Sequence, residues 1–225
     1  MTSINPGRRR AARGVVIVAP LLLAGCAGTD RTSRADTPQE GFEYRAARTA
    51  QPSTAPAGRI EVAEFFWFGC PHCNAMEPAI EAWAKRLPAD VSFRKVHVGL
   101  SERQQVHQRL FWTLESMGRS QALTPQVFRA IHVDARELAT REQCADFVAS
   151  RGVDRAAFLA AFDSPAVTDA MARANDFARA MGIEGVPSIA VAGKWLTSPG
   201  MAGSYASALS VADTLIARER AARGG

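Results

Sequence analysis

The chain has 225 residues, of which 47% are hydrophobic and 22% are charged. This composition is typical of one or two globular domains with a substantial core, and it excludes a disordered chain. The formal net charge of +5 does not indicate a nucleic-acid-binding protein, because Arg8, Arg9, Arg10 and Arg13 stand together at the N-terminus and the rest of the chain is close to neutral.

The N-terminal segment has the order of an export signal. In "RRRAARGVVIVAPLLLAGC", basic residues precede an apolar stretch over residues 15–23 that is too short to span a bilayer. The segment ends in "LAGC" and resembles a bacterial lipoprotein signal, so residues 1–25 are predicted to be removed and Cys26 to become a lipidated N-terminus. Ala27 stands where an aspartate would indicate inner-membrane retention, which mildly favours the outer membrane. The alternative is an ordinary cleaved signal with an incidental cysteine, which predicts a soluble periplasmic protein.

The next segments predict a tether and then a strand–helix–strand unit. Residues 26–38 are small and polar and end in a proline, which is typical of a flexible tether. "GFEYRAART" (41–49) predicts a first, edge strand. "RIEVAEFFWF" (59–68) and "VSFRKVHVGL" (91–100) are apolar enough for buried strands, and "CNAMEPAIEAWAKRLP" (73–88) between them has helical spacing. The order predicts a βαβ unit with two cysteines at the start of its helix.

The rest of the chain predicts a helical block and a return to the sheet. Residues 101–170 contain short amphipathic helices and no strand pattern. A longer helix follows, then an apolar hairpin in "GVPSIAVAGKWL", then a last helix from about Ser204 to Arg220. The predicted class is α/β, with one domain formed by residues 39–100 and 171–221 and a helical domain, 101–170, inserted into it.

Cys70 and Cys73 stand at the predicted start of the first helix. Thiols at this spacing can close a small disulfide ring, and the unpaired N–H groups and positive dipole end of a helix N-terminus stabilise a thiolate on Cys70. His72, when protonated, adds positive charge near the same sulfur. The alternatives are a structural disulfide and half of a zinc site, but no second Cys-x-x-Cys exists and no metal is expected. Export favours a redox use of the pair.

With these residues in view, the sequence resembles the DsbA family of bacterial disulfide-forming thiol oxidoreductases. The resemblance rests on "EFFWFGCPHC", "KVHVGL" and "GVPSIAVAGKW", in that order, with the helical block between the second and the third. It covers the chain from about Gly41 to Arg220. It implies a thioredoxin-like fold with an inserted all-helical domain, and catalytic donation of a disulfide to newly exported proteins.

The resemblance also implies roles for single residues. Cys70 matches the family's exposed nucleophile and Cys73 its buried partner, with Pro71 and His72 between them in the same motif. Val186–Pro187 matches the loop whose cis-proline faces the disulfide and whose backbone pairs with an extended substrate.

Other residues near these motifs carry weaker signals. Glu64 and Lys95 match positions where the family buries a charged pair beneath the active site. Mutual pairing alone explains them, because a lone buried charge is costly, and proton handling is the alternative role. Trp67 and Gly69 depart from the commoner family residues, which leaves the surface around the site undetermined but not its chemistry.

The remaining cysteine and histidines are expected to be structural. Cys144 lies on the same helical face as Val148, so a small buried thiol is predicted there. His97, His107 and His132 have no partners at ligand spacing and are predicted to be core or surface histidines.

The predicted reaction starts from a disulfide between Cys70 and Cys73. A substrate thiolate attacks Cys70 to give a mixed disulfide, which a second substrate thiol resolves. No bound cofactor is needed. The resemblance implies reduced exported proteins as substrates and reoxidation by a quinone-linked membrane oxidase of the DsbB type. The signal segment predicts a location at the periplasmic face of a membrane. Two alternatives remain open: a reductase or isomerase on the same fold, and a tethered binding or chaperone protein whose disulfide is structural.

Overall fold

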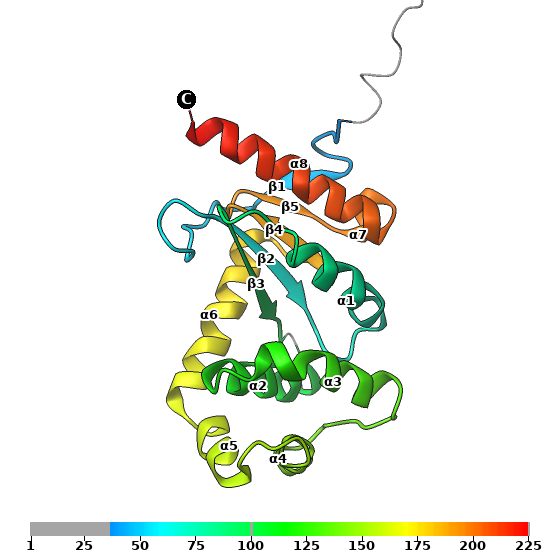
Figure 1. The fold of residues 1–225 in the computed structure, drawn as a ribbon, viewed down its shortest axis with the longest axis vertical. Helices are drawn as coiled ribbons and strands as arrows, with labels where there is room; N and C mark the ends of the chain where they lie inside the picture. The colour runs from blue at the N-terminus through cyan, green and yellow to red at the C-terminus, as the bar shows by residue number, and fades with distance from the viewer. Residues whose placement is uncertain (1–36, 100, 225) are drawn as a thin grey trace, which may run out of the picture. The chain divides into compact units, whose positions relative to one another are not determined.

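The computed structural model describes residues 37–99 and 101–224, which form five strands and eight helices (Figure 1). The predicted signal peptide, the lipidation site predicted at Cys26 and almost all of the predicted tether lie outside these residues. The strands are β1 (Tyr44–Ala46), β2 (Ile60–Phe66), β3 (Val91–His97), β4 (Ser188–Val191) and β5 (Trp195–Thr197). The helices are α1 (Pro71–Ala84), α2 (Glu102–Ser116), α3 (Ser120–His132), α4 (Arg141–Ala149), α5 (Arg155–Phe162), α6 (Pro165–Met181), α7 (Pro199–Ala202) and α8 (Tyr205–Arg223).

The strands form one mixed sheet in the order β1-β5-β4-β2-β3. β2 and β3 are parallel and are connected through α1, which confirms the predicted βαβ unit. β4 pairs antiparallel with both β2 and β5, and β1 lies at the edge as predicted. The whole of β2 is buried, as its continuous apolar run indicated.

The two faces of the sheet are covered by different helices. Along β2, Ile60 and Val62 pack with residues of α1 and α8, whereas Ala63 and Phe65 pack with residues of α6. This alternation follows from the period of two in a strand. Figure 1 shows α1 and α6 on opposite sides of the sheet.

Helices α2 to α5 lie between β3 and α6 in the chain and share an aromatic core. That core includes Phe111, Phe128 and Phe158, and Phe66 and Phe68 extend from the end of β2 into it. The fold is therefore the predicted thioredoxin-like one with a helical insertion. Within the part of the chain that the structure describes, no helix combines the length and the apolar character needed to cross a bilayer.

Two local features follow from capping. α6 begins with Pro165 after the N-cap Ser164 and ends at Met181, before the C-cap Gly182, which takes a left-handed conformation with φ of 74°. The short helix α7 was not predicted from the sequence. It is a single turn that begins at Pro199 after the N-cap Ser198, and four residues are too few to show a helical period.

Candidate active site

The two cysteines lie at the first turn of α1, shortly after the end of β2. Cys70 is the N-cap residue, with an extended backbone, and Pro71 occupies the first turn, where a missing N–H costs nothing. The sulfur of Cys70 accepts a hydrogen bond from the backbone N–H of Cys73 at 3.4 Å. Both residues are free thiols in this structure, and both are buried, Cys73 completely and Cys70 with 7% of its surface exposed.

The surroundings of the two thiols shift their pKa values in opposite directions. The pKa of Cys70 is lowered to about 6, chiefly by a hydrogen bond from the Cys73 side chain. Burial opposes this shift, and the backbone N–H groups of Cys73 and His72 and the charge of His72 add to it. The pKa of Cys73 is raised, mainly by burial and then by its neighbour Cys70. Cys70 is thus the thiol that ionises first.

The loop before β4 lies against the nucleophilic end of α1. The peptide bond between Val186 and Pro187 is cis, as the family resemblance implied. The Cys70 thiol lies 3.5 Å from the carbonyl oxygen of Val186, in hydrogen-bonding geometry. The pairing of β4 with β2, in which Phe65 stands opposite Ser188, holds this loop beside the cysteines.

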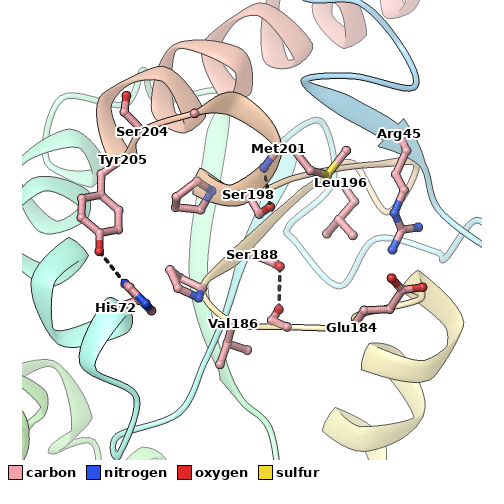
Figure 2. A pocket seen from close by; sticks show the side chains of 15 residues that line it. Arg45, His72, Glu184, Val186, Ser188, Leu196, Ser198, Met201, Ser204 and Tyr205 are labelled. Atoms are coloured by element: carbon pink, nitrogen blue, oxygen red, sulfur yellow. Dashed lines mark hydrogen bonds between the residues drawn. The ribbon is translucent and has the colours of Figure 1, made fainter.

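A cavity of about 700 Å³ adjoins this loop. Its lining includes His72 from α1, Val186 and Pro187 from the loop, and Met201 and Tyr205 from α7 and α8. Figure 2 shows the ring of His72 pointing towards the hydroxyl of Tyr205, and Nδ1 of His72 lies 3.1 Å from that oxygen. Tyr205 had no signal in the sequence, because it is brought to the site by a helix that begins far along the chain.

A buried group of charges lies beneath the cysteines. Glu64 and Lys95 are register partners in the parallel pair β2 and β3, and their side chains lie 3.0 Å apart. Two further carboxyl groups join the predicted pair: the amino group of Lys95 also lies 2.7 Å from Glu77 and 3.3 Å from Glu81. Sequence reasoning missed Glu77. Its signal was available, because it follows Cys73 by four residues and so shares that residue's face of α1.

Burial is the largest influence on the pKa values of Glu64 and Glu77. It raises the pKa of Glu64, against the opposing charge of Lys95. It also raises the pKa of Glu77, to about 7, where the charge of Lys95 again opposes it. Burial alone would lower the pKa of Lys95, but Glu64 and Glu77 together raise it. One positive charge therefore faces more carboxyl groups than it can neutralise, and Glu77 can hold a proton near neutral pH.

Three histidines fix the segment that precedes the cysteines. Nε2 of His97 in β3 accepts the backbone N–H of Phe68 at 3.1 Å, and Nε2 of His132 in α3 lies 2.7 Å from the carbonyl oxygen of the same residue. Nδ1 of His107 in α2 accepts the indole N–H of Trp67 at 3.1 Å. Within the described ranges, no group of three or more His, Cys, Asp and Glu side chains is placed to hold a metal ion.

Cys144 is a buried structural thiol, as predicted. It is fully buried in α4 and its thiol lies 3.4 Å from the carbonyl oxygen of Leu138. Burial raises the pKa of Cys144 to about 12. A thiol of this kind is a poor nucleophile at neutral pH.

Disulfide exchange needs a sulfur that attacks and departs readily as a thiolate, and a second sulfur within reach to close or open the ring. Cys70 and Cys73 have these opposite properties on one helical turn. The protein is therefore a thiol:disulfide oxidoreductase on a thioredoxin-like fold.

Comparison with known proteins gives the family. The pattern of the DSBA-like thioredoxin domain matches residues 61–205. The thiol:disulfide interchange protein DsbA of Pseudomonas aeruginosa is 41% identical over 210 residues, covering 93% of this chain and 98% of that protein. DsbA of Azotobacter vinelandii is 41% identical over 215 residues, covering 96% of this chain and all of that protein. The chain belongs to the DsbA-like thioredoxin family.

The structural comparison agrees with the sequence comparison. The crystal structure of Pseudomonas aeruginosa DsbA superimposes with a TM-score of 0.81 and 42% identity, covering 85% of this chain and 99% of that one. The relatives are named for thiol:disulfide interchange. This favours exchange chemistry over a tethered binding protein whose disulfide is only structural.

Proposed function

We propose that this protein is an oxidant, which gives the Cys70–Cys73 disulfide to reduced, exported proteins. The observation that carries the proposal is the position of Cys70 at the N-cap of α1, where its sulfur accepts the backbone N–H of Cys73 at 3.4 Å. This position accords with a pKa well below that of an ordinary cysteine thiol. A stabilised thiolate stabilises the reduced enzyme and so makes its disulfide a stronger oxidant, by about 30 mV for each 1.4 kcal/mol. The alternative on the same fold, a reductase or isomerase, needs a less stable dithiol form.

The reaction runs in two exchanges. A substrate thiolate attacks the Cys70 sulfur; the bond to Cys73 breaks, and the electron pair goes to the Cys73 sulfur, which takes up a proton because its pKa is raised. A second substrate thiolate then attacks the substrate sulfur of the mixed disulfide, and Cys70 departs as a thiolate. The substrate has lost two electrons and formed a disulfide, and the enzyme holds the pair as a thiolate and a thiol.

The loop and the charges beneath the site support these steps. The Val186–Pro187 loop presents backbone beside Cys70, where an extended substrate segment can pair with it, and the adjoining cavity offers room for its side chains. Glu64 acts electrostatically on Cys73 and raises its pKa. We assign the buried group of Glu64, Lys95 and Glu77 the role of holding a proton close to Cys73 while that thiol gains and loses one.

The proposed location is the periplasmic face of a bacterial membrane. The lipoprotein-type signal over residues 1–25 supports a lipid anchor at Cys26, mildly favouring the outer membrane, with the soluble periplasm as the alternative. Family membership supports reoxidation by a quinone-linked membrane oxidase of the DsbB type. The domain division proposed with this function is 39–100 and 171–221 for the thioredoxin-like part and 101–170 for the inserted helices.

The equilibrium redox potential tests the direction of the reaction. The purified protein is equilibrated in glutathione buffers of known ratio, and the reduced fraction is measured by alkylation of Cys70. We expect a potential nearer to that of the family's namesake, about −120 mV, than to that of thioredoxin, about −270 mV. A value near the thioredoxin one would favour the reductase and overturn the proposal.

A further inference from the structure

The indole of Trp67 occupies the space that a side chain at position 69 would fill. A Cβ atom built on Gly69 would lie 2.3 Å from Cζ2 of Trp67 and 2.9 Å from its Cη2. Real Cβ atoms do not approach other heavy atoms so closely, so the ring requires a glycine here. Trp67 and Gly69 are therefore one structural feature.

The other edge of the indole is fixed by the helical insertion. Nε1 of Trp67 donates to Nδ1 of His107 in α2 at 3.1 Å. Nε2 of His107 lies 2.9 Å from the carbonyl oxygen of Glu137, so the nitrogen facing the indole is the unprotonated acceptor. The ring is held by a buried histidine on one side and by the backbone of Gly69 beneath it.

This ring is partly exposed although its neighbours are not. Phe66 and Phe68 are both fully buried, whereas Trp67 packs against the aromatic core and keeps part of its surface in solvent. The carbonyl oxygen of Trp67 accepts the backbone N–H of Cys70 at 3.0 Å, and the indole lies against Gly69, the residue that precedes Cys70.

We propose that Trp67 is a specificity-determining residue. Its indole forms a rigid apolar wall of the substrate site on the side of the helical insertion, and it selects substrate segments with a bulky apolar side chain next to the reacting cysteine. The cavity lined by Val186, Pro187 and Tyr205 supplies a second wall from the other elements. A preformed wall adds affinity at little entropic cost, because the ring does not have to be ordered on binding. The proposal rests on the proposed function, since it describes how the same site chooses among its substrates.

Two dithiol peptides test the proposal. They differ only in the residue after one cysteine, which is Phe in the first and Ser in the second, and kcat/KM for oxidation is measured for each. We expect the wild-type protein to prefer the Phe peptide, and Trp67→Ala to reduce the ratio of the two values about tenfold, mainly through KM, as loss of one apolar contact surface predicts. An equal fall for both peptides would show that Trp67 only supports the loop, and an unchanged ratio would show that it contacts no substrate; either result overturns the proposal.

Two further variants keep the test independent of folding and of the oxidant function. Gly69→Ala should displace the indole and lower the ratio in the wild-type protein, but leave the ratio unchanged when Trp67→Ala is already present. Trp195→Ala, which removes a tryptophan on β5 that lies beneath Arg218, is the matched control and should leave the ratio as it is. A wild-type protein that oxidises neither peptide would refute the proposed function itself, whereas a changed preference at unchanged redox potential concerns Trp67 alone.

Discussion

The sulfur of Cys70 lies 3.5 Å from the carbonyl oxygen of Val186, although 116 positions separate the two residues in the chain. The thiol form can donate a hydrogen bond to this oxygen, whereas the thiolate cannot. The contact therefore favours the protonated state slightly, and the groups at the start of α1 must outweigh it to hold the pKa of Cys70 at about 6. The same carbonyl is the one that an extended substrate would meet beside the sulfur.

The first prediction separates the two active-site thiols. Cys73→Ser should accumulate mixed disulfides with substrate proteins through Cys70, because no neighbouring thiol remains to release them. Non-reducing gels followed by mass spectrometry of the adducts measure this. Cys144→Ser is the matched control and should behave as the wild type, since that thiol is fully buried. Adducts on Cys144 in place of Cys70 would contradict the assignment of the nucleophile.

The second prediction concerns the pH dependence of stability. The pKa of Cys70 in the folded dithiol form, about 6, is lower than the ordinary value of about 8.5 in the unfolded chain. The thiolate therefore stabilises the folded reduced protein fully above about pH 8.5, and this stabilisation is lost as the pH falls through the folded value. It amounts to about 1 kcal/mol at pH 7 and about 3 kcal/mol at pH 9.

The oxidised protein lacks this contribution, so the free energy of unfolding of the reduced form should rise relative to that of the oxidised form between pH 5 and pH 9. Denaturant melts of both forms across this range measure the difference. Cys70→Ser should give a profile without the rise. Parallel profiles for the reduced and oxidised wild-type proteins would contradict the lowered pKa.

The third prediction concerns the buried charges. Lys95→Met should lower the free energy of unfolding by about 3 to 5 kcal/mol, because it leaves Glu64 and Glu77 buried without their cation. Combining it with Glu64→Gln and Glu77→Gln should recover most of that loss, since neutral amides need no counter-charge. Urea melts at pH 7 measure both effects. If Lys95→Met alone is as stable as the wild type, the carboxyl groups of Glu64 and Glu77 are already protonated at that pH.

The fourth prediction concerns the anchor. Cys26→Ser should abolish the incorporation of labelled fatty acid and release the protein from the membrane fraction, because the proposed acceptor of the lipid is lost. The purified variant should keep its oxidase activity, as Cys26 precedes the catalytic fold in the chain. Labelling that persists in the variant would end the lipoprotein interpretation, and a periplasmic soluble protein would take its place.

Features set by local patterns were predictable from the sequence. The buried strand β2, the cysteines at the start of α1 and the run of short helices each follow from periodicity and composition within a few turns of chain. The pairing of Glu64 with Lys95 was expected only from the family resemblance, because the sequence of one strand does not determine its register with another. The cis bond at Pro187 was available only by the same route, since most X-Pro bonds are trans.

Other parts of the site depend on ring orientation and could not be predicted. The hydrogen bond from Trp67 to His107 joins residues 40 positions apart, and it exists only because the helical insertion places α2 beside the end of β2. The hydrogen bond between His72 and Tyr205 spans 133 positions. Glu77 was missed but could have been predicted, since its spacing from Cys73 placed it on the same face of a predicted helix.

The histidine contacts to Trp67 and Phe68 make the helical insertion part of the catalytic apparatus. Two of the three histidines, His107 and His132, belong to helices of the insertion, and the third, His97, belongs to the sheet. The segment before Cys70 is thus held by hydrogen bonds from both the helical insertion and the sheet. Substitutions that loosen the packing of the inserted helices will lower the activity of the site even where the substituted residue does not contact Cys70 or Cys73. Grafting this cysteine motif onto a thioredoxin scaffold without the helical insertion would transfer the thiols but not the hydrogen bonds from His107 and His132.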